Sequence, residues 1–330
     1  MDGAAAVRSL MQFERDGGRG LACLDGEGRA RIVTGVSGTL DLARQALAGR
    51  TTLALLAGQR AGEHLDLTAV RLLTPVDHPD PAHLVVSGTG LTHLGSAEGR
   101  DRMHAAAAAG KATDSMRMFL RGEEGGRPPP GEAGVQPEWF YKGDGSILVA
   151  TDAPLVMPAF AEDGGEEPEI AGIYLVAEDR TPLRLGFALG NEFSDHRVER
   201  ANYLWLAHSK LRQAALGPEL LLGDLPRDVR GVSRIRRGGS VVWERPFRTG
   251  EANMTHSLAN LEHHHFKYGR FRRPGDVHVH YFGTATASFA DGFETQQDDV
   301  FEIEADAFRL PLRNRLVRAA DEGPVRVTAL

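Results

Sequence analysis

The sequence has little of several features that mark particular classes of protein. Its 330 residues include a single cysteine, Cys23, which leaves no partner for a disulfide and no cysteine-based zinc site within one chain. The net charge is −7 and no block of basic residues occurs, so we expect no nucleic-acid partner. No apolar run approaches the length of a membrane span, so we expect no membrane partner.

The N-terminal stretch also lacks the apolar core of a signal peptide, because Asp2, Arg8 and Glu14 interrupt it. Together with the single cysteine, this predicts a cytoplasmic protein. The sequence contains no internal repeat that would indicate a solenoid.

Apolar residues make up 42% of the chain, which is enough for a substantial core. A proline-rich stretch over 75–81 is typical of a stiff linker. We therefore expect a small α/β N-terminal domain over residues 1–82 and a second domain over residues 83–330. Within the first domain, we expect a helix over 40–48 that is capped by Thr39. Strands with scattered helices follow, which predicts an α+β, mostly β fold.

The stretch from Glu167 to Glu192 carries the strongest candidate site. Glu167 and Glu169 are two residues apart, so in a strand they share a face. Strand-like runs over 170–176 and 183–189 predict a hairpin that returns Glu192 to this pair. Three converging carboxylates need a cation, and oxygen ligands favour Mg²⁺, with Mn²⁺ or Ca²⁺ as alternatives. Alone, a Glu-x-Glu pair is more often part of a solvated strand.

Further along, Gly238-Gly239 predicts a hairpin turn between strands over 230–237 and 240–248. Residues 97–120 and 257–268 are helical in composition, and 277–282 alternates like a strand. His278 and His280 would share a face of that strand, but no third histidine and glutamate at suitable spacing complete a cupin-type site. The run over 263–265 is interpreted as a surface or dimer contact.

Several short motifs together resemble those of the fumarylacetoacetate hydrolase superfamily. They occur in this order: Phe140-Tyr141-Lys142, Pro158, Glu167-Pro168-Glu169, Asn191-Glu192-Phe193-Ser194, Lys210, Leu216-Gly217-Pro218, Gly250-Glu251, Pro274-Gly275-Asp276, Gly283-Thr284 and Leu312-Arg313-Asn314. The resemblance covers about residues 83–318 and implies that superfamily's β-rich catalytic fold. It also implies that Glu167, Glu169 and Glu192 bind the metal, with Glu192 in place of an aspartate.

Two sequence segments, over 87–93 and 138–143, are most similar to the sugar-acid branch of the superfamily. This branch contains the GguC-type proteins, which are related to 2-keto-3-deoxy-pentonate dehydratases. The carbon–carbon hydrolases of the superfamily activate water with a histidine and a glutamate. Here Ser96 and Gly99 stand at those positions, and His93 stands where a tyrosine is usual. This departure argues against hydrolysis and is compatible with elimination.

The resemblance therefore implies a Mg²⁺-dependent lyase that dehydrates a 2-keto-3-deoxy sugar acid, such as the pentonate 2-keto-3-deoxyarabonate, to an oxo-acid semialdehyde. In this reaction a base removes the C3 proton of a 2-oxo acid and the C4 hydroxyl leaves. Lys210 is the predicted base, with a pKa lowered by burial near a cation. Lys142 is expected to hold a substrate oxygen or a loop carbonyl. The expected substrate contacts are Gly283, Thr284, His93 and Ser96.

Two alternatives stay open at this point. One is a hydrolase that cleaves an acylpyruvate or 2,4-diketo acid, and the other is a non-catalytic protein that binds a metal and a sugar acid. For Lys210, the alternative role is a surface lysine or a salt bridge to one of the glutamates. Members of the superfamily are usually homodimers, and the apolar-faced segment over 203–215 would contribute to such an interface.

Overall fold

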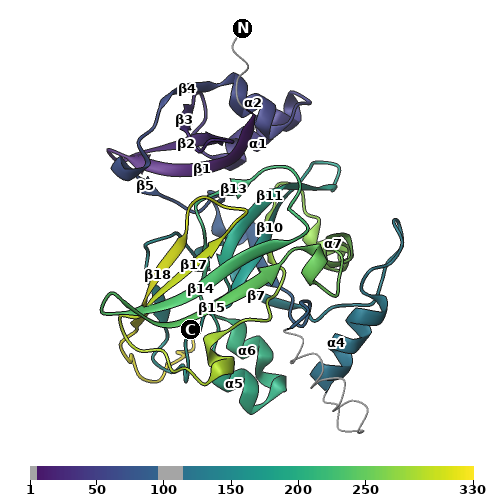
Figure 1. Ribbon diagram of the computed structural model, residues 1–330, viewed down its shortest axis with the longest axis vertical. Helices are drawn as coiled ribbons and strands as arrows, with labels where there is room; N and C mark the ends of the chain where they lie inside the picture. Colours follow the sequence, from purple (N-terminus) through teal and green to yellow (C-terminus); the bar gives the residue numbers. More distant parts are fainter. Residues whose placement is uncertain (1–5, 96–113) are drawn as a thin grey trace.

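The computed structural model describes residues 6–95 and 114–330. Two β-sheets form its framework, with short helices around them (Figure 1). The prediction of a mostly β fold is therefore confirmed. Ser96 and the first part of the helix expected over 97–120 lie outside the described residues; the part that is described forms α4, Asp114–Gly125.

The larger sheet has the strand order β4-β3-β2-β1-β13-β11-β10-β16-β6-β7, with β5, β8 and β12 paired beside this path. Its N-terminal strands are β1 Val7–Arg15, β2 Gly18–Asp25, β3 Ala30–Val33, β4 Ala61–His64 and β5 Arg71–Leu72. Its other strands are β6 Leu84–Gly88, β7 Phe140–Asp144, β8 Leu148–Val149, β10 Pro168–Val176, β11 Pro182–Asn191, β12 Ala214–Leu216, β13 Leu220–Leu221 and β16 Val277–Tyr281.

The N-terminal strands lie together with α1 (Thr39–Ala48) and α2 (Leu53–Gln59) at one end of the molecule (Figure 1). They join the rest of the sheet through two residue pairs between β1 and β13. The division at residue 82 stays a prediction. The predicted cap of α1 is wrong: Gly38 is the N-cap residue, and the Thr39 hydroxyl donates instead to the carbonyl of Pro75, 2.6 Å away.

The second sheet has the order β15-β14-β17-β18-β9. Its strands are β9 Leu155–Met157, β14 Val229–Arg237, β15 Ser240–Thr249, β17 Val300–Ala305 and β18 Leu312–Arg318. The hairpin between β14 and β15 turns at Gly238 and Gly239 as predicted. Both have positive φ angles, 57° and 86°, which a two-residue hairpin turn of this kind requires.

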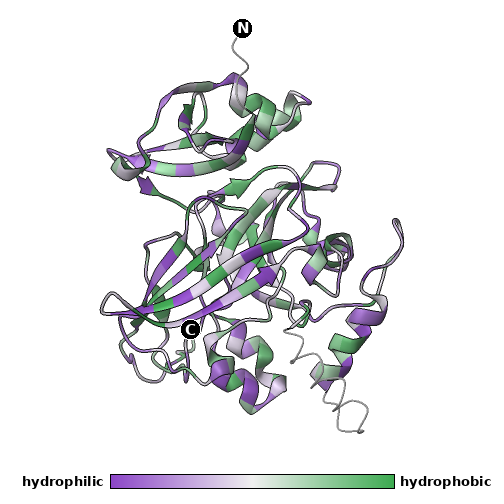
Figure 2. Cartoon of the chain, in the orientation of Figure 1, coloured by the Kyte–Doolittle hydropathy of each residue, from purple (hydrophilic) through white to green (hydrophobic). Residues whose placement is uncertain are grey.

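The main core lies between the two sheets. Phe187 from β11 packs with Phe282, and Phe193 packs with Phe301 of β17. Every residue of β10 is buried, because this strand is covered on both faces, and Figure 2 shows it and its neighbour β11 as largely hydrophobic. A charged side chain at the end of β10 therefore needs partners, which the site described below supplies.

Three further helices surround the sheets: α5 His196–Ala201, α6 Leu206–Lys210 and α7 Leu258–Phe266. The Ser257 hydroxyl caps α7 by accepting from the amide of Asn260. The assignment of the 263–265 run to the surface is wrong for two of its members, because His264 and His265 are buried. His265 stacks on His280 of β16 with ring centroids 4.5 Å apart.

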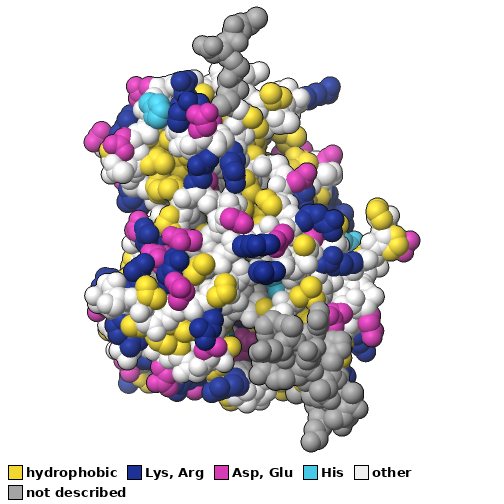
Figure 3. Space-filling view, in the orientation of Figure 1, with side chains coloured by type: hydrophobic (Ala, Val, Ile, Leu, Met, Phe, Trp, Pro, Cys, Tyr) yellow, Lys and Arg dark blue, Asp and Glu magenta, His cyan; other side chains and the backbone are white. Residues whose placement is uncertain are grey.

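The surface that Figure 3 displays carries acidic and basic side chains interspersed, with no extended block of one sign. Among the helices of the described residues, none combines the length and apolar character needed to cross a membrane.

Candidate metal centre

The hairpin of β10 and β11 brings the three predicted carboxylates together. Glu169 on β10 is paired with Gly190 on β11, and the amide of Glu192 donates to the carbonyl of Glu167 over 3.0 Å. Each glutamate offers one oxygen, and these three oxygens lie within 4.8 Å of one another. The strand period and the hairpin register thus place the carboxylates on one side of the sheet.

Glu169 is the carboxylate that most needs a further partner. Its Oε2 accepts from the amide of Gly283 over 2.6 Å, whereas its Oε1 is buried without a hydrogen-bond donor. Burial raises the pKa of Glu169 well above its ordinary value, and Glu167 and Glu192 raise it further. A buried oxygen without a donor, among two other carboxylates, fits a cation ligand.

Glu167 is held by two cationic side chains. Its Oε1 accepts from Lys210 Nζ over 2.6 Å and lies 3.0 Å from Nε2 of His196. Burial alone would raise the pKa of Glu167, but Lys210 and His196 outweigh it and hold the pKa below its usual range. Glu167 is therefore a carboxylate at neutral pH, as a metal ligand must be.

Lys142 and Lys210 both bind Glu192, and Lys142 owes its position to a β-bulge. In the pairing of β6 with β7, Val86 faces Gly143 and Ser87 faces Tyr141, so Lys142 is the extra residue. Its fully buried Nζ contacts Glu192 and donates to the carbonyls of Phe193 and of Lys210, the last residue of α6, over 2.7 and 3.0 Å. Burial lowers the pKa of Lys142, against the attraction of Glu192.

Lys210 lies at the centre of the carboxylates, and its expected lowered pKa beside a bound cation stays a prediction. Its Nζ is 2.8 Å from Oε2 of Glu192 and 3.1 Å from the hydroxyl of Ser194, in addition to its bond to Glu167. Burial works to lower the pKa of Lys210, yet Glu167, Glu192 and Glu199 outweigh burial and raise it well above the usual value. The lysine is held as an ammonium ion.

The predicted substrate contacts that the structure describes already form hydrogen bonds within the protein. The Gly283 amide is engaged by Glu169, and the Thr284 hydroxyl accepts from the amide of Thr286. Both ring nitrogens of His93 contact threonine hydroxyls, those of Thr92 at 3.0 Å and Thr249 at 2.8 Å. A substrate contact by His93 would need one of these bonds to open. Ser96 and the neighbouring position 99 lie outside the described residues.

Glu138 is a side chain near this centre that sequence reasoning missed. It is buried, it accepts from the hydroxyl of Tyr203, and it lies against Gly90, where a Cβ would be only 1.8 Å from its Oε2. Burial raises the pKa of Glu138 to about 7, although Tyr203 and Lys210 work in the other direction. The one signal in the sequence was its place as the first residue of the segment over 138–143.

His196 and Glu166 were also missed, and they tie the glutamates to the loop after β16. Burial opposes a charge on His196, but Asp163 and Glu167 outweigh it and raise the pKa to about 10. The ring of His196 stacks on Phe289 with centroids 5.3 Å apart. Glu166 accepts from the amide and the hydroxyl of Ser288 over 2.7 and 2.8 Å.

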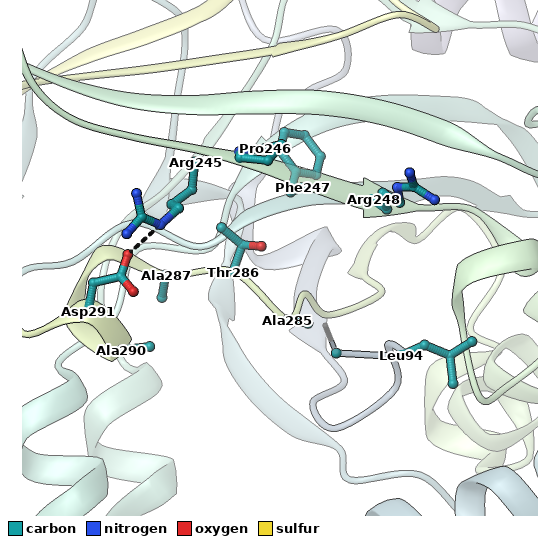
Figure 4. A pocket seen from close by; sticks show the side chains of 11 residues that line it. Leu94, Arg245, Pro246, Phe247, Arg248, Ala285, Thr286, Ala287, Ala290 and Asp291 are labelled. Atoms are coloured by element: carbon teal, nitrogen blue, oxygen red, sulfur yellow. Dashed lines mark ion pairs between the residues drawn. The ribbon is translucent and has the colours of Figure 1, made fainter. Parts of the chain in front are cut away.

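A cavity of about 410 Å³ lies beside this loop, between β15 and residues 285–291. Figure 4 shows Thr286 directed into the cavity. It also shows the ion pair of Arg245 and Asp291, in which Nε lies 2.9 Å from Oδ2. None of the three glutamates lines the cavity. It shares the segment after Gly283 with the metal centre.

No protein-family model matches the sequence, and no curated protein matches it. Among solved structures, the chain is similar to 2-keto-3-deoxy-D-arabinonate dehydratase in its apo form, with 16% identity, a TM-score of 0.69, and coverage of 95% of this chain and 100% of that one. A structure of this dehydratase complexed with magnesium and 2,5-dioxopentanoate matches at the same identity and coverage with a TM-score of 0.68.

The chain is also similar to 5-carboxymethyl-2-hydroxymuconate delta-isomerase from Mycobacterium smegmatis. The identity is 18%, the TM-score is 0.59, and the match covers 95% of this chain and 100% of that one. These likenesses confirm the predicted β-rich fold, which the chain shares with the dehydratase and the isomerase. Because every identity is low, they establish the fold and leave the reaction to be argued from the site.

Proposed function

We propose that this protein is a metal-dependent hydro-lyase that dehydrates a 2-keto-3-deoxy sugar acid, with a pentonate such as 2-keto-3-deoxyarabonate as the substrate. The observation that carries the proposal is the buried cluster of Glu167, Glu169 and Glu192 in contact with two lysines. A metal-assisted enolisation site combines a cation that polarises a carbonyl with a nearby base that takes a proton, and an amine can be that base. The similar dehydratase with bound magnesium supports the same assignment.

The three glutamates would hold Mg²⁺, because their donor set is made of oxygen alone and Glu169 Oε1 has no other partner. When bound, the ion would act as a Lewis acid on the keto oxygen of a 2-oxo acid and so make its C3 proton more acidic. Mn²⁺ and Ca²⁺ suit the same donor set and are the alternatives to test.

Lys210 is the proposed base for the C3 proton. Its ammonium form depends on the negative charges of Glu167 and Glu192, so the pKa of Lys210 would fall once a divalent cation shares those charges. Lys142 binds Glu192 and the carbonyls of Phe193 and Lys210, and so positions the end of α6 that carries Lys210.

Glu138 is the proposed acid for the departing hydroxyl. A carboxyl group with a pKa of about 7 is partly protonated at neutral pH and can donate that proton. Thr284 is the proposed contact for the substrate carboxylate. Gly283, His93 and Ser96 are the other proposed substrate contacts.

We further propose a homodimer in the cytoplasm. Four apolar side chains on or beside the segment over 203–215 are exposed on the described surface: Phe160 at 78%, Leu204 at 86%, Trp205 at 48% and Leu211 at 51%. An exposed apolar patch of this kind marks an association surface, here for a second copy. A molecular mass in solution that stays monomeric at all concentrations would contradict this.

The function is tested by incubating the purified protein with a panel of 2-keto-3-deoxy sugar acids and Mg²⁺ and identifying the products by mass. Dehydration predicts a semialdehyde with the intact carbon chain and one water fewer. A shortened carbon chain would instead indicate the hydrolase alternative. Saturable binding of the acids without any product would indicate the non-catalytic alternative.

A further inference from the structure

Residues 138–142, which include the start of β7, separate the metal centre from a second cavity. The side chains of Glu138, Phe140 and Lys142 face the metal centre. Lys142 contacts Glu192, and Lys210 lowers the pKa of Glu138. The Nζ of Lys210 lies 5.0 Å from the ring centroid of Phe140. Trp139 and Tyr141 face the other way and line a cavity of about 790 Å³. None of the three glutamates lines this cavity.

This cavity, which we call the arginine pocket, is rich in positive charge. Three arginines, Arg180, Arg270 and Arg273, line it together with a single acidic residue, Asp276. Arg273 donates to both oxygens of Asp276 over 3.0 Å. Among the described residues, neither Arg180 nor Arg270 forms an ion pair. Two of the three guanidinium groups thus lack a counter-charge.

Part of the arginine pocket is held in place by its surroundings. The indole Nε1 of Trp139 donates to His265 over 3.2 Å, and Phe271 stacks on the same histidine with centroids 5.1 Å apart. Arg180 donates to the carbonyls of Gly269 and Arg272 over 3.2 and 3.3 Å. Arg270 lies over the ring of Phe271, 5.3 Å from its centroid. Trp139, Arg180 and Arg270 are therefore each held by contacts within the protein.

We propose that the arginine pocket binds an anionic small molecule that carries a planar ring, of the class that nucleoside monophosphates represent. Guanidinium groups match the geometry of a phosphate with paired hydrogen bonds, whereas the rings of Trp139 and Tyr141 suit stacking with a flat base. The volume lies within the range of small-molecule sites. The ligand is a second one, distinct from the proposed 2-oxo acid, and this inference does not rest on the proposed reaction.

Calorimetric titration of the full-length protein with AMP tests the proposal, with inorganic phosphate and adenosine as probes of the two halves of the site. AMP is expected to bind saturably at one site, and each half alone at least about tenfold more weakly. Arg270→Leu and Tyr141→Ala are expected to weaken AMP binding at least about tenfold. Arg44→Leu removes an exposed arginine of α1 outside the pocket and is expected to leave it unchanged.

Thermal unfolding of each variant controls for loss of the fold. AMP binding is also expected to persist in Glu169→Gln and without Mg²⁺, because no glutamate of the metal centre lines the arginine pocket. The proposal is overturned if AMP shows no saturable binding at millimolar concentration. It is equally overturned if a folded Arg270→Leu variant binds AMP as the unaltered protein does, or if Glu169→Gln abolishes binding.

Discussion

The ammonium nitrogen of Lys210 lies 2.6 Å from Oε1 of Glu167, so the proposed base is bonded directly to a proposed metal ligand. A cation that binds Glu167 competes with this ammonium for the same oxygen. Metal binding and loss of the lysine proton should therefore favour one another, because the two cations repel each other at the shared carboxylate and loss of the proton removes one of them. Without a metal, the ammonium of Lys210 is the counter-charge of the carboxylates. When a metal takes over this part, Lys210 becomes free to act as the base.

Glu169→Gln tests the metal centre. The amide keeps the size of the side chain but cannot supply a negatively charged oxygen, so Mg²⁺ affinity should fall at least about 100-fold and turnover should be lost. Calorimetric titration with Mg²⁺ measures the affinity without reference to activity. Glu178→Gln, at an exposed position, is the matched control and should behave like the unaltered protein. Full Mg²⁺-dependent turnover in Glu169→Gln would remove the metal role of this residue.

Glu138 predicts a pH dependence with a definite sign. Its carboxyl group has a pKa of about 7 and acts as an acid only while protonated, so kcat/KM should decline as the pH rises through about 7. The Tyr203 hydroxyl stabilises the charged form, so Tyr203→Phe should move this decline to higher pH. Glu138→Gln should have low activity and no such decline. An unchanged profile in both variants would assign the decline to another group.

Sequence alone located the hairpin with its carboxylates, since strand alternation and turn residues are local signals. The two-glycine turn of β14 and β15 was predictable for the same reason. Local patterns could not show that Lys210 would be paired with Glu167 and Glu192, which raises its pKa, because this depends on the packing of α6 against the hairpin. The burial of His265 and the position of Glu138 likewise depend on contacts between segments far apart in the chain.

The fold predicts an unequal response of buried and exposed ion pairs. Asp195 and Arg212 form a buried pair at 3.1 Å, and Asp195 also caps α5 by accepting from the amide of Val198. Asp195→Ala should lower the free energy of unfolding by about 3–5 kcal/mol, because it leaves a buried guanidinium without a counter-charge. Glu14→Ala breaks the exposed pair with Arg71 and should cost at most about 1 kcal/mol. Urea denaturation measures both, and equal losses would contradict this reasoning.

The central claim is that the metal and Lys210 together remove a proton from the carbon next to a keto group. Exchange of the methyl hydrogens of pyruvate with deuterated water at saturating Mg²⁺, followed by NMR, measures this step without a leaving group. We expect exchange in the unaltered protein and none above background in Lys210→Met, with Mg²⁺ and pyruvate still bound. In dehydration, the same variant should lose kcat more than it changes KM. Exchange by Lys210→Met at the unaltered rate would contradict the account.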